Sequence, residues 1–147
     1  VGEQFAAKDT GSAWFDSAGA TYQGMINQVK NAYEQEDGTI IALENPEVKA
    51  IYDSVLKAAE TQSANVGQWS EDWTAAFQKD GFATQLCPGW MLGVVEGNAA
   101  GVEGWDIANV FPGGGGNWGG SFLTVPAMGA NQAEAKKLAA WLTAPEQ

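Results

Sequence analysis

The sequence predicts an α/β layered domain, on the strength of three observations. Apolar side chains recur at helical spacing in several segments of roughly 9 to 15 residues, and short apolar runs alternate with these segments. Such alternation is typical of helices packed on a small sheet. The chain has 147 residues, of which 45% are hydrophobic, so it is long enough for one domain with a core and too apolar for a disordered chain.

Four helices are expected in the first two thirds of the chain. The first carries an apolar stripe over residues 22–29. Asn45 is expected to cap the second, with Pro46 at its first helical position. Ser70 precedes an acidic first turn and is expected to cap the third, while Pro88 is expected to begin the fourth, which runs to about Glu96.

Four short apolar runs are expected to be strands, namely residues 12–16, 82–87, 105–111 and 121–125. A last helix is expected near the end of the chain, where Asn131 and Glu134 resemble a capping box. The apolar residues of that helix are expected to form one inward stripe, made of Ala135, Leu138, Ala139 and Leu142.

Composition excludes several classes of function. The formal net charge is −11 and no basic cluster occurs, so nucleic acid and anionic membrane surfaces are unfavourable partners. No apolar run is long enough to cross a bilayer. The chain has no histidine and a single cysteine, Cys87, which is expected to be a small buried hydrophobe. Nucleophilic triads, a metal site and a cofactor are therefore not expected.

The most informative run is the glycine-rich segment 112–121, because it contains a tryptophan. Trp118 offers a flat apolar ring, while Asn117 and Ser121 add an amide and a hydroxyl beside it. Gly119 and Gly120 have no side chains, so a ligand can approach the backbone closely there. An aromatic face with polar neighbours suits a sugar ring, which has an apolar face and a rim of hydroxyls.

Seven tryptophans occur, and their positions divide them into two groups. Trp14, Trp90 and Trp118 lie at or just beyond the expected carboxyl ends of strands, the edge at which open α/β sheets bind ligands. We expect these three rings to converge on one ligand-facing wall. The other four indoles are expected to be structural: Trp73, Trp105 and Trp141 in the core, and Trp69 as a hydrophobic staple before a helix cap.

Two other interpretations of the residues remain open. A carbohydrate-active enzyme would need a pair of carboxylates, for which Asp16 and Asp106 are candidates among the 18 acidic residues. A structural lobe without a ligand is the other alternative. The pattern Gly114-x-Gly116-x-x-Gly119 matches a dinucleotide fingerprint only formally, because a strand rather than a helix is expected to follow it.

Four blocks of the sequence resemble an extracellular solute-binding protein (family 1) of a sugar ABC importer. They are residues 14–19, 82–92, 112–121 and 140–146, and the resemblance extends over nearly the whole chain. It implies a periplasmic-binding-protein-like lobe with a small mixed sheet flanked by helices. Residues 1–147 would form a single lobe, the C-terminal one of two, without the N-terminal lobe and truncated at both ends.

The resemblance also implies a function and a set of contact residues. The protein would bind a neutral oligosaccharide without chemistry on it, and the full-length parent would deliver that sugar to an ABC permease. It would be extracellular and lipid-anchored, or periplasmic. Trp14 and Trp90 would stack on sugar rings, and Asp16 would accept hydrogen bonds from sugar hydroxyls. Trp118 would contact the sugar from the hinge side or the floor of the cleft, together with its neighbours Asn117, Gly119, Gly120 and Ser121.

Overall fold

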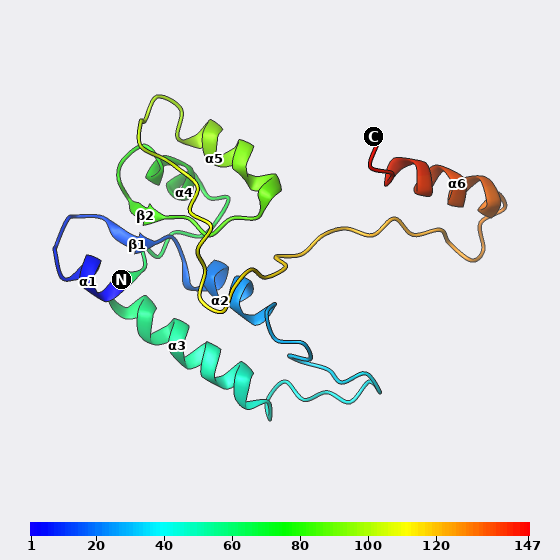
Figure 1. Ribbon diagram of the computed structural model, residues 1–147, viewed down its shortest axis with the longest axis horizontal. Coiled ribbons are helices and arrows are strands. Elements are labelled where there is room, and N and C mark those ends of the chain that lie inside the picture. Colours follow the sequence, from blue (N-terminus) through cyan, green and yellow to red (C-terminus); the bar gives the residue numbers. More distant parts are fainter.

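A two-stranded parallel sheet forms the centre of the computed structural model, which describes residues 1–147 (Figure 1). Strand β1 (Ala13–Phe15) pairs with β2 (Phe82–Thr84), with Ala13 opposite Phe82 and Phe15 opposite Thr84. Phe15 also forms an isolated parallel bridge with Ser63. The predicted α/β class is confirmed, and the small sheet is parallel.

Two helices from the crossover between the strands pack against each other. They are α2 (Ala18–Ile26) and α3 (Pro46–Gln62), and the short helix α1 (Gly2–Ala6) packs against α3 and β1. The predicted cap of α3 is confirmed, because the Asn45 side chain accepts a hydrogen bond from the Glu47 N–H at 3.0 Å. Its amide also donates to two backbone carbonyls before the helix, which fixes the direction in which α3 begins.

A second group of short helices covers the other strand. It consists of α4 (Glu71–Ala76), the 3-10 turn η1 (Gly89–Met91) and α5 (Leu92–Asn98), and Figure 1 shows α4 and α5 above the strands with α3 below them. Ser70 caps α4 as predicted, accepting from the Trp73 N–H at 3.1 Å. Pro88 itself lies just before η1, which begins one residue later than predicted.

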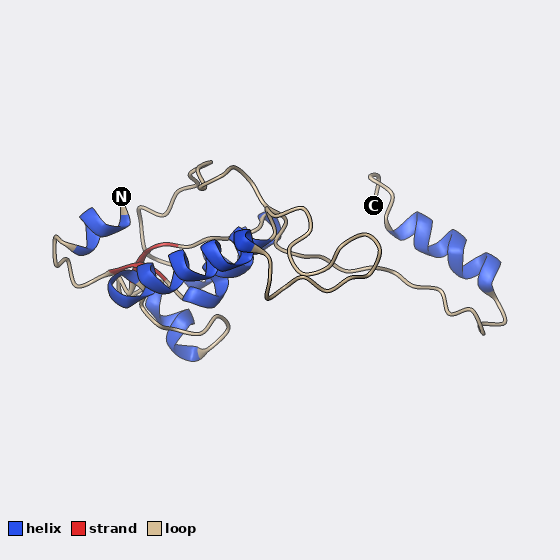
Figure 2. Ribbon diagram, turned by 90° about the horizontal axis from the view of Figure 1, so that it is seen from below, coloured by secondary structure: helices blue, strands red, loops and turns tan.

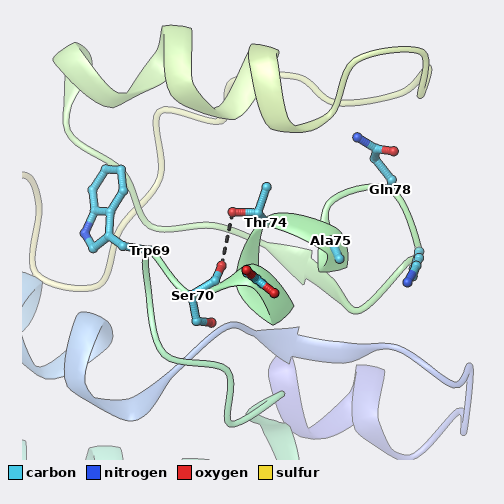
Figure 3. Close-up of a pocket in the computed structure, with 7 residues that line it drawn as sticks. Trp69, Ser70, Thr74, Ala75 and Gln78 are labelled. Carbon is cyan, nitrogen blue, oxygen red and sulfur yellow. Dashed lines mark hydrogen bonds between the residues drawn. The ribbon is translucent and has the colours of Figure 1, made fainter.

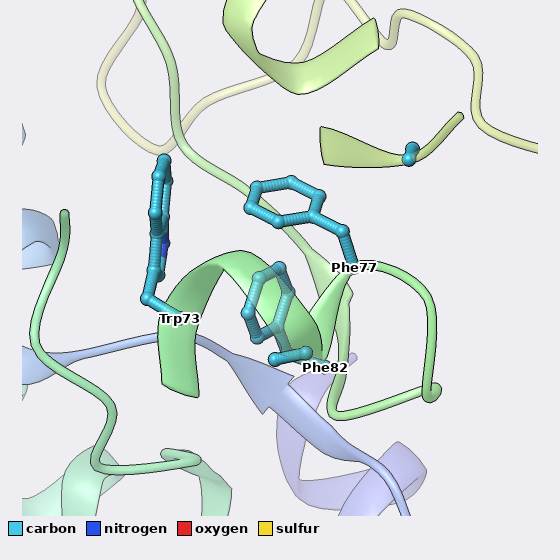
Figure 4. Packing of buried hydrophobic residues seen from close by; sticks show 5 residues of the cluster. Trp73, Phe77 and Phe82 are labelled. Carbon is cyan, nitrogen blue, oxygen red and sulfur yellow. The ribbon is translucent and has the colours of Figure 1, made fainter. Parts of the chain in front are cut away.

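The largest buried cluster lies between α4, β2 and α5 (Figure 4). Phe77 packs edge-on against Trp73 at 4.9 Å and against Phe82 at 5.0 Å, the geometry that aromatic rings prefer. Trp105 packs against Phe77 at 5.3 Å and is half-buried. The prediction that Trp73 is a core residue is therefore confirmed, whereas Trp105 is only partly buried at the side of the cluster.

The two strands predicted late in the chain are wrong. Residues 105–111 and 121–125 contain no strand, and most of them are exposed. A strand is stable only when its backbone groups pair with a neighbour, and neither segment pairs with β1 or β2. Apolar composition alone therefore did not make these segments regular.

Helix α6 (Gln132–Leu142) lies away from the rest of the molecule, at the end of an extended segment (Figure 2). The predicted inward stripe is wrong for these 147 residues, because no residue of α6 is buried and Leu138 is 56% exposed. Trp141, predicted to be a core residue, is also 56% exposed. The predicted capping box is absent, since the Asn131 side chain makes no cap hydrogen bond.

None of the helices combines the length and the apolar character needed to span a bilayer.

Candidate functional site

Two exposed indoles lie nearly parallel at the surface above the sheet. Trp69 and Trp90 are 58% and 64% exposed, their ring centroids are 6.1 Å apart, and their planes differ by 8°. Trp69 directly precedes the cap of α4, and Trp90 lies in η1. We call these two residues the indole pair. Exposure of two aromatic rings to water is energetically unfavourable, and the pair offers a ligand a large flat apolar surface.

The residues on either side of Trp90 fix its position before α5. Pro88 has an extended backbone and its carbonyl accepts from the Met91 N–H at 2.9 Å, which closes the 3-10 turn. Met91 is 1% exposed and anchors the turn in the interior. Because the residue after Trp90 points inward, the indole of Trp90 is left on the surface.

The backbone of Trp69 is strained. Its φ is +71°, in the left-handed region that bulky L-residues rarely adopt. A residue held in such a conformation costs about 1–3 kcal/mol and persists only where its surroundings fix it. Here its ring also packs on Trp73 at 5.2 Å, and the neighbouring Ser70 N–H donates to the Gly67 carbonyl at 3.1 Å.

Behind Trp73 lies the carboxyl group of Asp16, which is 0% exposed. Its Oδ2 accepts from Gln68 Nε2 at 2.9 Å and from Trp73 Nε1 at 3.1 Å, while Oδ1 accepts from the Ser17 N–H at 2.6 Å. A buried carboxyl group is stable only when its oxygens are hydrogen-bonded, and these are. The oxygens of Asp16 therefore face donors of the protein itself.

A shallow hollow of about 400 Å³ begins at Trp69 and follows α4 (Figure 3). Its lining offers hydroxyl, carboxylate, amide and ammonium groups next to the indole. In Figure 3 the Thr74 hydroxyl donates to the Ser70 carbonyl at 3.1 Å, so its oxygen still has lone pairs that can accept hydrogen bonds. The lining residues are Trp69, Ser70, Glu71, Thr74, Ala75, Gln78 and Lys79.

A second hollow, of about 230 Å³, lies between α2 and α3 and is chemically different. Its lining is almost entirely apolar, with Tyr22 and Tyr52 in edge-to-face contact at 6.0 Å. The Tyr22 hydroxyl is hydrogen-bonded to that of Tyr33 at 2.9 Å. Burial and this bond raise the pKa of Tyr22 to about 12. The hollow therefore offers few free polar groups to a hydroxyl-rich ligand.

The three predicted binding indoles have different aromatic neighbours. Trp14 is half-buried and packs on Phe5 of α1 at 5.3 Å, whereas Trp90 packs on Trp69. No aromatic contact joins Trp14, Trp90 and Trp118. In their place the structure pairs Trp90 with Trp69, which the sequence pattern assigns to a staple. Trp69 does pack on Trp73, as a staple would, yet it remains exposed.

The glycine-rich segment packs along α2. Gln23 Nε2 donates to the Trp118 carbonyl at 2.9 Å, and Gln28 Nε2 donates to the Pro112 carbonyl at 3.0 Å. A Cβ atom on Gly116 would lie 2.9 Å from the Gly24 carbonyl oxygen, so only glycine fits at position 116. At this point the lack of a side chain serves contact with α2.

The residues around Trp118 are exposed at the surface. Asn117 accepts from the Gly119 N–H at 3.3 Å through its side chain, and both residues are exposed. A Cβ atom on Gly119 or Gly120 would meet nothing within 4 Å, so the backbone is open to an approaching molecule there. Ser121 is also exposed. These four residues and the half-buried Trp118 form a second surface patch, which we call the glycine patch.

The remaining reactive groups are dispersed. No group of three or more Cys, Asp or Glu side chains lies close enough to hold a metal ion. Asp106 is exposed and accepts only from the Ile107 N–H, at 2.7 Å. Cys87 is half-buried, and burial raises the pKa of its thiol. Neither Asp16 nor Asp106 lines either hollow.

The exposed indole pair, with the polar hollow beside it, is the candidate ligand-binding surface of the chain. Comparison with known proteins then identifies the family. A model of bacterial extracellular solute-binding proteins matches residues 1–147, and the chain belongs to this family. A crystal structure of an extracellular solute-binding protein of family 1 is 52% identical to the chain and superimposes with a TM-score of 0.90.

The length of the chain differs from that of its solved relative. The match covers 99% of this chain and 38% of the other one, so the chain spans about two fifths of that protein. No curated protein matches the sequence. The description of the matched family is that of solute-binding proteins that act outside the cell.

Proposed function

We propose that this chain is the C-terminal lobe of a two-lobed solute-binding protein that captures a neutral oligosaccharide for an ABC importer. The observation that carries the proposal is the indole pair, Trp69 and Trp90, exposed and nearly parallel beside a hollow lined with hydroxyl and amide groups. The flat apolar face of a pyranose fits an indole, and its hydroxyls fit the polar rim.

Charge supports a neutral solute. The net charge of −11 repels anionic solutes at a distance, whereas it leaves a neutral sugar unaffected. The charged groups near Trp69 are of both signs, Glu71 and Lys79, so neither sign dominates the hollow. A strongly charged ligand would gain little from this lining.

The tryptophans and the glycine patch each have a proposed part in binding. Trp90 stacks on the sugar, and Trp69 completes the surface on which it does so. The glycine patch contacts the sugar from the α2 side, through Trp118 and the open backbone around Gly119. Trp14, which is half-buried against Phe5, contributes the part of its ring that remains exposed.

The proposed mechanism is closure without chemistry. In a two-lobed protein the second lobe would cover the indole pair, remove water and complete the hydrogen bonds of the sugar hydroxyls. The loaded protein would then meet an ABC permease outside the cytoplasmic membrane, either on a lipid anchor or in the periplasm. Asp16 and Asp106 support the absence of glycosidic cleavage, because one is fully buried and the other lines neither hollow.

Calorimetry on the full-length protein tests this proposal. Gluco-, xylo- and malto-oligosaccharides are titrated separately, and at least one is expected to bind. Trp90→Ala should weaken that binding about tenfold or more, because a central aromatic contact is lost. Tyr52→Ala is the matched control, since Tyr52 is 52% exposed and lies on α3.

Two results would contradict the proposal. One is an absence of heat with every sugar together with tight binding of a peptide. The other is release of reducing ends from a bound oligosaccharide, which would indicate an enzyme.

A further inference from the structure

We infer that Asp16 is a positioning residue, which holds Trp69 in place for stacking on Trp90. The inference rests on the proposed function only in taking the indole pair as the ligand surface. Asp16 lies directly after β1 and is 0% exposed, so it contacts no ligand from where it stands. Its effect on binding must therefore pass through the residues that it contacts.

The first connection passes through Gln68, the residue before Trp69. Its side-chain amide donates to Asp16 Oδ2 at 2.9 Å. The same stretch of chain is tied to the backbone of Asp16, because the Ser63 hydroxyl and the Val66 N–H donate to the Asp16 carbonyl at 3.2 and 3.3 Å. Asp16 thus fixes the approach of the chain to Trp69, whose φ of +71° needs such support.

The second connection passes through Trp73, on which the Trp69 ring packs. Trp73 Nε1–H points to Asp16 Oδ2 at 3.1 Å, and this sets the orientation of the buried indole. The centroid of Trp69 lies 5.2 Å from that of Trp73 and 6.1 Å from that of Trp90. A rotation of Trp73 would therefore move the surface on which Trp69 rests.

The indole of Trp73 also contacts the segment that leads from β2 to Trp90. Trp73 Nε1 lies 3.2 Å from Gln85 Oε1, and Gln85 Nε2 donates to the Leu86 carbonyl at 2.7 Å. Gln85 directly follows β2, and Trp90 lies five residues further on. Asp16 and Gln85 together place Trp73 between the two segments that present the indole pair.

The decisive variant is Asp16→Asn in the full-length protein. It keeps the size of the side chain but puts an NH₂ group among donors, so at least one of the three hydrogen bonds is lost. We expect sugar affinity to fall about tenfold, the effect of losing a buried hydrogen bond to a charged group. Asp106→Asn is the control, because Asp106 is exposed and makes only the bond to its neighbour Ile107.

A double-mutant cycle separates positioning from general loss of structure. In a Trp69→Ala background, Asp16→Asn should cost no further affinity, because the residue that it positions is gone. Equal losses in the two backgrounds would overturn the inference. Gln68→Ala and Trp73→Phe each remove one donor and should act in the same direction, which keeps the test decisive if Asp16→Asn does not fold.

A measurement without ligand separates this inference from the proposed function. In an NMR spectrum of ¹⁵N-tryptophan-labelled protein, Trp90→Ala removes the ring-current shift that Trp90 causes at the Trp69 indole N–H. Asp16→Asn should move that resonance in the same direction, and an unmoved resonance would overturn the inference. If the wild-type protein binds no sugar, the proposed function fails, and the NMR result alone decides the role of Asp16.

Discussion

Residues 1–100 and residues 101–147 differ sharply in how they are packed. All 14 buried residues lie between Phe15 and Ala99, and none lies in the last third. The first region contains both strands and every helix except α6. In the second region, only α6 is regular, and its apolar side chains face solvent. Both regions contain apolar runs of similar composition, so composition does not explain the difference.

The difference shows where a local sequence pattern is sufficient to form a regular element. In the first region, the strands at residues 13–15 and 82–84 pair with each other and bury Phe15 and Phe82. In the second region, runs of comparable character have no partner strand and remain extended coil. Helix α6 forms because its hydrogen bonds are internal, although nothing covers it.

The largest expected effect compares one buried and one exposed indole. Trp73→Ala should lower the free energy of unfolding by about 3–5 kcal/mol, because it opens a cavity in the aromatic cluster. Trp141→Ala on α6 should change it by less than about 0.5 kcal/mol. Urea denaturation of the 147-residue chain measures both. Similar losses in the two variants would mean that α6 is packed in solution, and the contrast between the regions would fail.

A smaller effect tests the contact between the glycine-rich segment of residues 101–147 and helix α2 in residues 1–100. Gly116→Ala should destabilise the protein by roughly 1–2 kcal/mol, because its Cβ atom would meet the Gly24 carbonyl oxygen at 2.9 Å. Gly115→Ala is the matched control, since a Cβ atom there meets nothing within 4 Å. The midpoint of chemical unfolding reports both values. If the two alanine variants were equally stable, contact of the glycine-rich segment with α2 would have to be abandoned.

The smallest effect compares two asparagines at helix starts. Asn45→Ala removes the cap of α3 and should cost about 1 kcal/mol. Asn131→Ala should cost less than about 0.5 kcal/mol, because the Asn131 side chain makes no cap hydrogen bond. Thermal unfolding followed by circular dichroism compares the variants, and a loss at Asn131 as large as that at Asn45 would show that α6 is capped after all.

Much of the fold was predictable, because its signals are local. The caps Asn45 and Ser70 and the core position of Trp73 follow from spacing and residue type, and the structure confirms them. Within the candidate site, Trp90 was predicted to lie just beyond a strand, and its exposure agrees with that position. The pairing with Trp69 was not predictable, since the contact between Trp69 and Trp90 joins two separate segments and depends on tertiary structure. The one local signal was the spacing of Trp69 and Trp73 on either side of the helix cap.

The sequence by itself determined the α/β class, most of the helices and the acidity of the chain. These properties depend on side-chain type and on spacing within a few residues, which act before distant segments meet. Only the tertiary structure decided that Asp16 is buried behind Trp73 and that Trp69, rather than Trp14 or Trp118, lies against Trp90. Those arrangements need hydrogen bonds and ring contacts between segments far apart in the chain, and their geometry exists only after the strands have paired.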